Sequence, residues 1–262
     1  MVAAVGSWLD ARAHGGEWRL RIDDLDEPRV VPGAAEGFFR TLERFGLGWD
    51  GPVLFQSKQR DLYEDTLRKL KEAGLTFPCN CTRKVLSGQE VYPGTCRFKR
   101  EVPARSVRFK SAEGNVVWQD LIAGEISYQV GLEIGDFLLR NSHQVFSYHL
   151  ANVADDAMWN VSHVIRGADL IPATAAQLLL MDALKWGRPM HGHLPLAFNN
   201  LGQKLSKQTL APSVDVRPVH EVLISVLEHL GYRNVPIGSA SEILDWALNH
   251  WLAIRQSIEV TR

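Results

Sequence analysis

Residues 161–197 read VSHVIRGADLIPATAAQLLLMDALKWGRPMHGHLPLA. The β-branched run at 161–166 predicts a buried strand, and apolar residues at helical spacing predict a helix over 173–186. A second strand is predicted over 193–197. Two strands joined by a helix are typical of a parallel sheet, which binds ligands at the carboxyl ends of its strands.

The same alternation precedes this stretch. We predict a helix that ends at Gly15 and a strand over 18–22. Two further helices follow, one starting at Pro32 and one with Ser57 as its N-cap. The N-terminal part therefore belongs to the same sheet as residues 161–197.

The middle of the chain has a different pattern. Short strand-like runs occur at 106–110, 116–121, 125–130 and 137–140, and a helix resumes over 146–159. From Asp215 the pattern is helical. We predict an α/β fold, in which a doubly wound, Rossmann-like parallel sheet carries a β-rich insertion and is followed by a short helical region. The expected division is 1–75 and 146–214 for the sheet region, 76–145 for the insertion and 215–262 for the C-terminal region.

Composition excludes several classes of protein. The chain has 262 residues, with 29 basic and 30 acidic side chains, so any nucleic acid must be held by a local patch. No apolar run approaches the roughly 18–20 residues of a membrane span. The N-terminus lacks the basic start of a signal peptide, and three cysteines do not suggest a disulfide framework. We expect a cytoplasmic protein with no membrane association.

The cysteines form one cluster, because all three fall between residues 79 and 96. Thiolates suit Zn²⁺, which takes four ligands in structural sites. The cysteines are Cys79, Cys81 and Cys96, and the candidates for a fourth ligand are Tyr92, His143 and Glu90. The alternative is three buried, inert thiols.

Two further patterns suit charged ligands. Lys204-Leu-Ser-Lys-Gln208 places two ammonium groups and a hydroxyl on a polar loop, which suits a polyphosphate, although a solvated basic loop is the commoner explanation. Arg21-Ile-Asp-Asp-Leu-Asp26 places carboxylates after a strand, where they can hold an ammonium group or a metal, or simply cap a turn. Arg166 ends a predicted strand, where its fork suits a carboxylate.

Taken together and in order, four segments resemble the glutamyl branch of the class I aminoacyl-tRNA synthetases: RIDDLDEPR (21–29), VIRGADL (164–170), GHLPLAF (192–198) and KLSKQ (204–208). Within that branch the chain is most similar to the short glutamyl-queuosine tRNA(Asp) synthetases. CNC followed by YPGTC resembles their zinc module. Gln208 stands where the full-length enzymes usually have Arg, and the short C-terminal region leaves no room for an anticodon-binding domain.

The resemblance implies an enzyme that activates glutamate with ATP and Mg²⁺, then transfers the glutamyl group to queuosine at the wobble position of tRNA(Asp). It implies a monomer with one structural zinc. The implied catalytic residue is Lys207, which binds ATP with Lys204 and Ser206. The implied glutamate-binding residues are Asp23, Tyr148 and Arg166. The implied zinc ligands are Cys79, Cys81, Tyr92 and Cys96. A run of basic residues over 97–110 is a candidate RNA-binding patch, unless it is only a solvated face.

The sequence departs from the family in two places. Asp23 stands where the family usually has Glu, one methylene longer. Met1 aligns within the helix that follows the family's HIGH-type ATP motif, so about 20 residues are absent and one sheet position is expected to be empty. A misplaced start codon or a truncation that abolishes activity would each explain this. Two alternatives follow: a fragment of an ordinary glutamyl-tRNA synthetase, or an inactive zinc-bearing module that binds tRNA or a protein.

Overall fold

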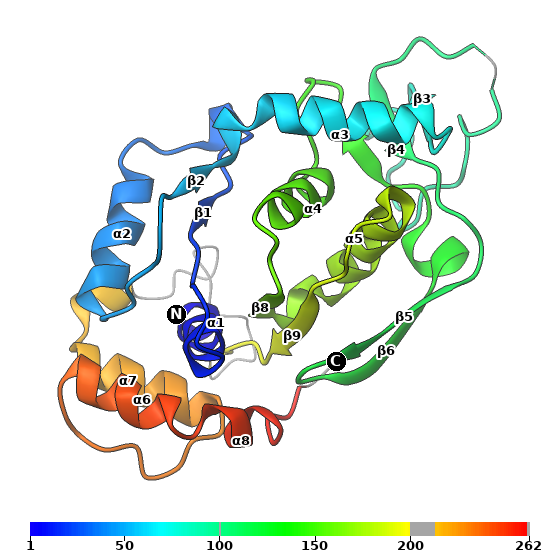
Figure 1. Cartoon of the computed structure of the whole chain (residues 1–262). Coiled ribbons are helices and arrows are strands. Elements are labelled where there is room, and N and C mark those ends of the chain that lie inside the picture. Colours follow the sequence, from blue (N-terminus) through cyan, green and yellow to red (C-terminus); the bar gives the residue numbers. More distant parts are fainter. Residues whose placement is uncertain (100, 200–212, 261–262) are drawn as a thin grey trace.

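The computed structural model describes residues 1–99, 101–199 and 213–260 (Figure 1). Before the insertion the elements are α1 (Val2–Ala13), β1 (Arg21–Ile22), α2 (Ala34–Arg44), β2 (Leu54–Phe55) and α3 (Arg60–Glu72). The insertion contains β3 (Thr76–Cys79), β4 (Ser106–Phe109), β5 (Asn115–Asp120), β6 (Gly124–Gln129) and β7 (Leu138–Arg140). Then come α4 (Tyr148–Met158), β8 (His163–Gly167), α5 (Ile171–Leu184), β9 (Met190–Leu194), α6 (Val219–His229), α7 (Ala240–Leu248) and α8 (Trp251–Arg255).

The parallel strands form two separate pairs. β1 pairs with β2, and β8 pairs with β9 from His163 opposite Met190 to Gly167 opposite Leu194. The predicted α/β fold with parallel strands is confirmed. The predicted single sheet is not: within residues 1–99, 101–199 and 213–260 no strand joins the two pairs. A cavity lies between β1 and β8.

Three predicted boundaries were wrong for local reasons. β9 covers Met190–Leu194 rather than 193–197, since Pro195 has no N–H to continue the ladder. β1 has only two residues, although the carbonyl of Leu20 still accepts the N–H of Leu54 at 3.0 Å. Ser57 caps no helix, because its N–H and its hydroxyl both donate to Asp24, at 2.8 and 2.6 Å.

The insertion folds as two antiparallel units. β3, β4 and β7 form one sheet, and β5 and β6 form a separate hairpin. The hairpin reaches the parallel strands, where the N–H of Leu121 donates to the carbonyl of His191 at 2.7 Å. Gly192 leaves room for both neighbours, because a Cβ there would lie 2.7 Å from Ile165 of β8 and 3.3 Å from Ile122 of the hairpin. The hairpin therefore packs beside β9 at the end of the parallel pair.

Two apolar cores hold these parts together. One packs α3, α4 and α5 against the insertion strands, and the other packs α1, β8 and β9 against the C-terminal helices. In Figure 1, α6, α7 and α8 lie beneath α1 on the side away from α3. Trp251 of α8 is completely buried and donates to Asp10 of α1 at 2.9 Å. The predicted helical tail is thus part of the second core.

No helix in the described part of the chain combines the length and apolar character that a membrane span requires.

Candidate functional site

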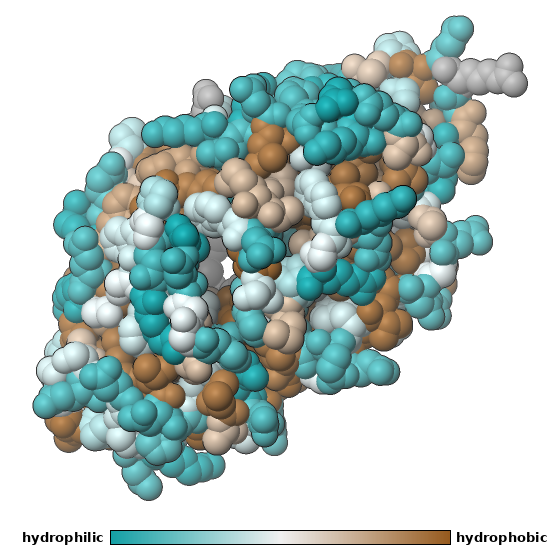
Figure 2. Space-filling view, in the orientation of Figure 1, coloured by the Kyte–Doolittle hydropathy of each residue, from teal (hydrophilic) through white to brown (hydrophobic). Residues whose placement is uncertain are grey.

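A cavity of about 540 Å³ lies between the two parallel pairs, lined from α1, β1, α4 and β8. Figure 2 shows the surface hollowed on this face, between the positions of β1 and α4 in Figure 1. Its lining includes Asp23 and Arg166, both predicted from the sequence, together with Arg21 and Asp156. A larger cavity of about 750 Å³, lined from α4 and α5, contains none of the predicted site residues.

Arg21 links the carboxylates of this cavity. Its Nη1 donates to Asp156 at 2.8 Å, and its Nε donates to Asp23 at 2.9 Å. Burial alone lowers the pKa of Arg21, but the neighbouring carboxylates outweigh it and raise that pKa above its usual range. The Asp23 side chain remains 50% exposed, so this carboxylate is accessible while one of its oxygens is held by Arg21.

A buried carboxyl supports Arg21 from behind. Asp155 accepts hydrogen bonds from Tyr63 and from Gln56, both at 2.8 Å, and lies 3.7 Å from Arg21. Burial raises the pKa of Asp155 to about 6, against the lowering effect of these hydrogen bonds. Gln56, Tyr63 and Asp155 belong to no motif that could be recognised in the sequence.

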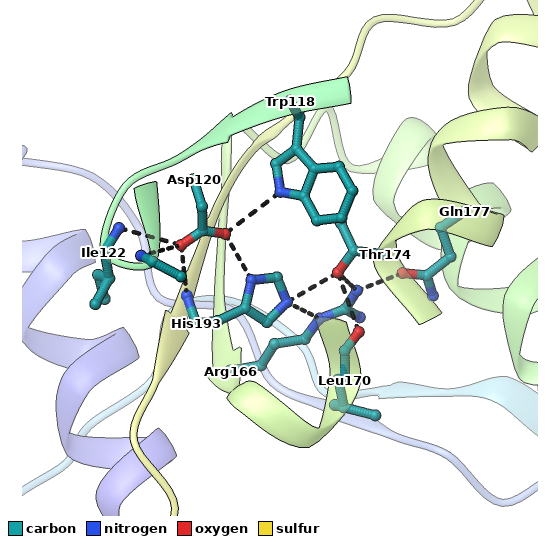
Figure 3. Close-up of polar contacts among 9 residues, drawn as sticks. Trp118, Asp120, Ile122, Arg166, Leu170, Thr174, Gln177 and His193 are labelled. Carbon is teal, nitrogen blue, oxygen red and sulfur yellow. Dashed lines mark hydrogen bonds and ion pairs between the residues drawn. The ribbon is translucent and has the colours of Figure 1, made fainter. Parts of the chain in front are cut away.

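Arg166 enters the cavity from the end of β8 and is held on its inner side (Figure 3). Its Nη2 donates to the hydroxyl of Thr174 at 2.6 Å and to Oε1 of Gln177 at 2.7 Å. Its Nε lies 3.5 Å from Nε2 of His193. Burial lowers the pKa of Arg166, although the guanidinium remains a cation.

Tyr148 is partly accessible, with 39% of its surface exposed. It is the first residue of α4, which Ser147 caps by accepting the N–H of Leu150 at 3.4 Å. Burial raises the pKa of Tyr148, and its side chain is not part of the cavity lining. The structure thus places Arg166 and Asp23 in the lining of one cavity, and the side chain of Tyr148 outside that lining.

Lys204, Ser206 and Lys207, the residues predicted to bind ATP, lie outside the described residues.

The three cysteines meet at the end of β3. Their sulfur atoms lie within 4.8 Å of one another, and those of Cys81 and Cys96 are 3.7 Å apart. The hydroxyl oxygen of Tyr92 lies 3.5 Å from the sulfur of Cys79 and 3.6 Å from that of Cys81. Neither Glu90 nor His143 joins this group of described residues.

These spacings suit a tetrahedral metal site. A zinc ion about 2.3 Å from sulfur and about 2.0 Å from oxygen places two sulfur atoms about 3.8 Å apart, and a sulfur and an oxygen about 3.5 Å apart. Three separations match these values: Cys81 to Cys96, Cys79 to Tyr92, and Cys81 to Tyr92. The donor set of three thiols and a phenol therefore fits a metal ion of this size and geometry.

The surroundings favour a thiolate at Cys79. Burial raises the pKa of this thiol, but hydrogen bonds from Tyr92 and from a backbone N–H more than offset that effect. Arg108 adds to the lowering, as its Nε donates to the sulfur at 3.4 Å, and the pKa of Cys79 falls to about 7. Thiolates, not thiols, bind metals.

The basic run over 97–110 is partly internal. Arg108 is 7% exposed, and its guanidinium lies 3.9 Å from the centre of the Tyr92 ring. Arg97 is paired with Asp136, and Arg100 lies outside the described residues. Arg97 and Arg108 are therefore used within the insertion, and an RNA-binding patch stays a prediction for the other basic residues of this run.

Four residues received no role from the sequence: Arg21 and Asp156 in the cavity, and Asp120 and His193 behind Arg166. Arg21 opens the quoted segment RIDDLDEPR, but only the carboxylates of that segment were interpreted. His193 did lie in a quoted segment, GHLPLAF, but a histidine on a predicted strand carries no signal of its partner. Asp120 and His193 are 73 positions apart and meet only through the packing of the hairpin on β9.

The fold is that of a class I tRNA synthetase catalytic domain. The family model described as tRNA synthetases class I (E and Q), catalytic domain, matches residues 2–92 and 95–243. The glutamyl-Q tRNA(Asp) synthetase of Aromatoleum aromaticum is 44% identical over 96% of this chain and 83% of its own length. A protein of the same name from Dechloromonas aromatica is 42% identical over 96% of this chain and 88% of its own length. Another from Chromobacterium violaceum is 43% identical over 95% of this chain and 87% of its own length. The chain belongs to the family of glutamyl-Q tRNA(Asp) synthetases, as its sequence segments predicted.

Solved structures agree at the level of the fold. Glutamate-tRNA synthetase from Elizabethkingia anophelis has a TM-score of 0.70 and 27% identity, covering 79% of this chain and 49% of that one. A glutamate tRNA ligase from Elizabethkingia meningosepticum, in complex with its amino acid, has a TM-score of 0.69 at the same identity, covering 79% and 48%. The chain thus spans about half the length of these two synthetases.

Proposed function

We propose that this chain activates glutamate with ATP, accompanied by Mg²⁺, and transfers the glutamyl group to queuosine at the wobble position of tRNA(Asp). The observation that carries the proposal is the match over nearly the whole chain to relatives named glutamyl-Q tRNA(Asp) synthetase. It is supported by a cavity that presents a cationic fork and a carboxylate together, which suits an amino acid with a second carboxyl group.

The substrate roles follow from charge and position. Arg166 pairs with a carboxylate of glutamate, because it lines the cavity while Thr174 and Gln177 fix its inner side. Tyr148, which the family resemblance assigns to glutamate binding, is the first residue of α4, the helix that lines this cavity through Asn152 and Asp156. Asp23 accepts the α-ammonium group, with Arg21 holding its carboxylate in place. Positioning of this kind supplies much of the acceleration in a reaction that needs little covalent chemistry from the protein.

The reaction proceeds in two displacements. A carboxylate oxygen of glutamate attacks the α-phosphorus of ATP, and pyrophosphate leaves with the electron pair of the broken P–O bond. A hydroxyl of queuosine then attacks the glutamyl carbonyl, AMP leaves, and the hydroxyl proton is lost to solvent. Lys207, with Lys204 and Ser206, stabilises the charge on the phosphates in the first step.

We also propose that Cys79, Cys81, Tyr92 and Cys96 hold one structural zinc ion. The tetrahedral spacing of their donor atoms supports this ligand set. The N–H of Cys96 donates to the Tyr92 oxygen at 2.8 Å, a bond that stabilises a phenolate. Because burial and the neighbouring thiols raise the pKa of Tyr92, the phenol releases its proton only when a cation is bound.

Metal analysis tests the zinc site. Protein purified under reducing conditions should contain one zinc per chain, and Cys81→Ser should abolish it. Tyr92→Phe should weaken zinc binding while leaving the three thiolates as ligands. Ser87→Ala, an exposed change in the same segment, serves as the control. Folded wild-type protein that contains no zinc and takes up none on titration would exclude the site.

Pyrophosphate exchange tests the enzymatic proposal. We expect glutamate-dependent exchange with ATP in the absence of tRNA, followed by glutamylation of queuosine-containing tRNA(Asp) only. The assay uses the chain as printed and a form preceded by the strand and HIGH-type motif of its family. Arg166→Gln should raise KM for glutamate about 100-fold, as expected for a lost charged pair, whereas Arg188→Gln, which breaks an exposed pair with Asp182, should not. Absence of exchange in the extended form, or charging of tRNA(Glu), would refute the proposal.

A further inference from the structure

Asp120 ends strand β5 of the inserted hairpin and is buried behind Arg166 (Figure 3). One of its oxygens accepts three backbone N–H groups, from Ile122 at 3.1 Å, Ala123 at 3.0 Å and His193 at 3.0 Å. Its other oxygen lies 2.6 Å from Nδ1 of His193. Although burial opposes ionisation, these bonds lower the pKa of Asp120 to about 2, so the group is a carboxylate.

The carboxylate fixes the tautomer of His193, whose side chain is completely buried. An ionised carboxylate only accepts hydrogen bonds, so Nδ1 carries the proton that lies between them. The other ring nitrogen, Nε2, faces the Nε–H of Arg166 at 3.5 Å. A proton on Nε2 as well would place an imidazolium against the guanidinium. Nε2 is therefore left with its lone pair, as an acceptor.

Thr174 transmits this choice to Arg166. Its hydroxyl oxygen accepts from Nη2 of Arg166 at 2.6 Å and lies 2.8 Å from Nε2 of His193. The hydroxyl has one proton, which Nε2 or the carbonyl of Leu170, at 3.1 Å, can accept. Since Nε2 holds a lone pair at the shorter distance, the hydroxyl donates to it. The oxygen lone pairs of Thr174 then face Arg166.

We propose that Asp120 is a positioning residue for Arg166 and acts through His193 and Thr174. The proposal rests on the proposed function, in which Arg166 pairs with a carboxylate of glutamate. The chain of hydrogen bonds keeps an acceptor against the inner side of the guanidinium, so the outer side stays aimed into the cavity. A guanidinium that binds a carboxylate through two hydrogen bonds must be held in a fixed orientation by its neighbours. The insertion thus contributes a residue to substrate binding without contacting the substrate.

Glutamate affinity tests the proposal at Thr174, where Val replaces the hydroxyl at nearly the same size and Ser keeps the hydroxyl. We expect Thr174→Val to raise Kd for glutamate about tenfold in isothermal titration calorimetry, because Arg166 loses an acceptor of a charged hydrogen bond. Thr174→Ser should restore affinity to within about twofold, since it keeps the hydroxyl. Asp182→Asn, on the exposed side of the same helix, is the matched control. The affinity for ATP should not change in step with that for glutamate.

The tautomer of His193 gives a second measurement that a merely structural role would not move. In ¹⁵N spectra of the imidazole, the wild type should show a protonated Nδ1 and an unprotonated Nε2. Asp120→Asn should shift His193 toward the Nε2-protonated tautomer, because the amide nitrogen donates where the carboxylate accepted. The same variant should weaken glutamate binding, whereas Thr174→Val should leave the tautomer unchanged. Thermal unfolding of each variant identifies any that fail to fold.

The outcomes separate this proposal from the proposed function. If the wild type binds no glutamate, the proposed function fails. If the wild type binds glutamate but folded Thr174→Val binds it as tightly as Asp182→Asn does, the positioning role is overturned. A wild-type His193 protonated on Nε2 alone would overturn it as well.

Discussion

Lowering the pH from 7 to 5 should destabilise the folded chain through His191, and His191→Phe should remove that part of the loss. His191 lies on β9 and is 2% exposed. Burial lowers its pKa to about 3, with further lowering from Arg166 and His193. The unfolded state, with an ordinary histidine pKa of about 6.5, takes up a proton in this range while the folded state does not. This contribution to stability is therefore present above about pH 6.5 and is lost as the pH falls toward 3.

The size of the effect follows from the two pKa values. Between pH 7 and pH 5, a histidine with a pKa of about 6.5 unfolded and about 3 folded loses about 2 kcal/mol of stabilisation. His149, with a pKa lowered to about 4 by burial, adds a loss of about the same size. Asp155 acts in the opposite direction. Because burial raises its pKa to about 6, its protonation in the folded state increases the free energy of unfolding by about 1 kcal/mol over this pH range.

Because these contributions overlap, the assay compares differences. Urea unfolding at pH 7 and pH 5 gives the decrease in the free energy of unfolding for each protein. The decrease for His191→Phe should be smaller than that for the wild type by about 2 kcal/mol. Changes in packing caused by Phe affect both pH values equally and cancel. His220→Gln, at an exposed position, should lose as much as the wild type. If the losses of His191→Phe and the wild type agree within about 0.5 kcal/mol, the assignment to His191 is refuted.

Two further predictions concern buried contacts and are also measured by urea unfolding. Tyr63→Phe removes a donor to the buried carboxyl of Asp155 and should lower the free energy of unfolding by about 1.5–3 kcal/mol. Tyr232→Phe removes a bond to the neutral carbonyl of Ala247 and should lower it by only about 0.5–1.5 kcal/mol. Equal losses would contradict the conclusion that the charge of Asp155 strengthens its hydrogen bond. Leu9→Ala, at a fully buried position of α1, should cost about 2–5 kcal/mol, and a cost below 1 would show that α1 is not held by the second core.

The sequence predicted the parts of the fold whose pattern is long and regular. The helix predicted over 173–186 is α5 at 171–184, and the strand pattern at 125–130 is β6 at 124–129. β2 was missed because two residues have no period to detect. β9 was placed too late, because a run with two histidines does not look like a buried strand. Those histidines are buried because Asp120 and the neighbouring hairpin surround them.

The candidate site was predictable where a residue type and its place in a motif were enough. Arg166 was expected at the end of a strand and is found there, in the lining of the cavity. The cysteine cluster was expected from spacing, and the structure selects Tyr92 from the three candidates for its neighbour. The support of Arg166 by Asp120 was beyond such reasoning, since it depends on how a hairpin docks on a distant strand.

The docking of the β5–β6 hairpin also limits how this chain can be re-engineered. The insertion, residues 76–145, is joined to the rest of the chain at two points of the sequence, so it suggests itself as a unit to exchange between relatives in order to alter RNA preference. Here the exchange would carry away Asp120 and Leu121, which hydrogen-bond to His193 and His191. A chimera that receives residues 76–145 from a relative must therefore retain this chain's own residues at the tip of the hairpin. It must also retain Gly192, against which the hairpin packs.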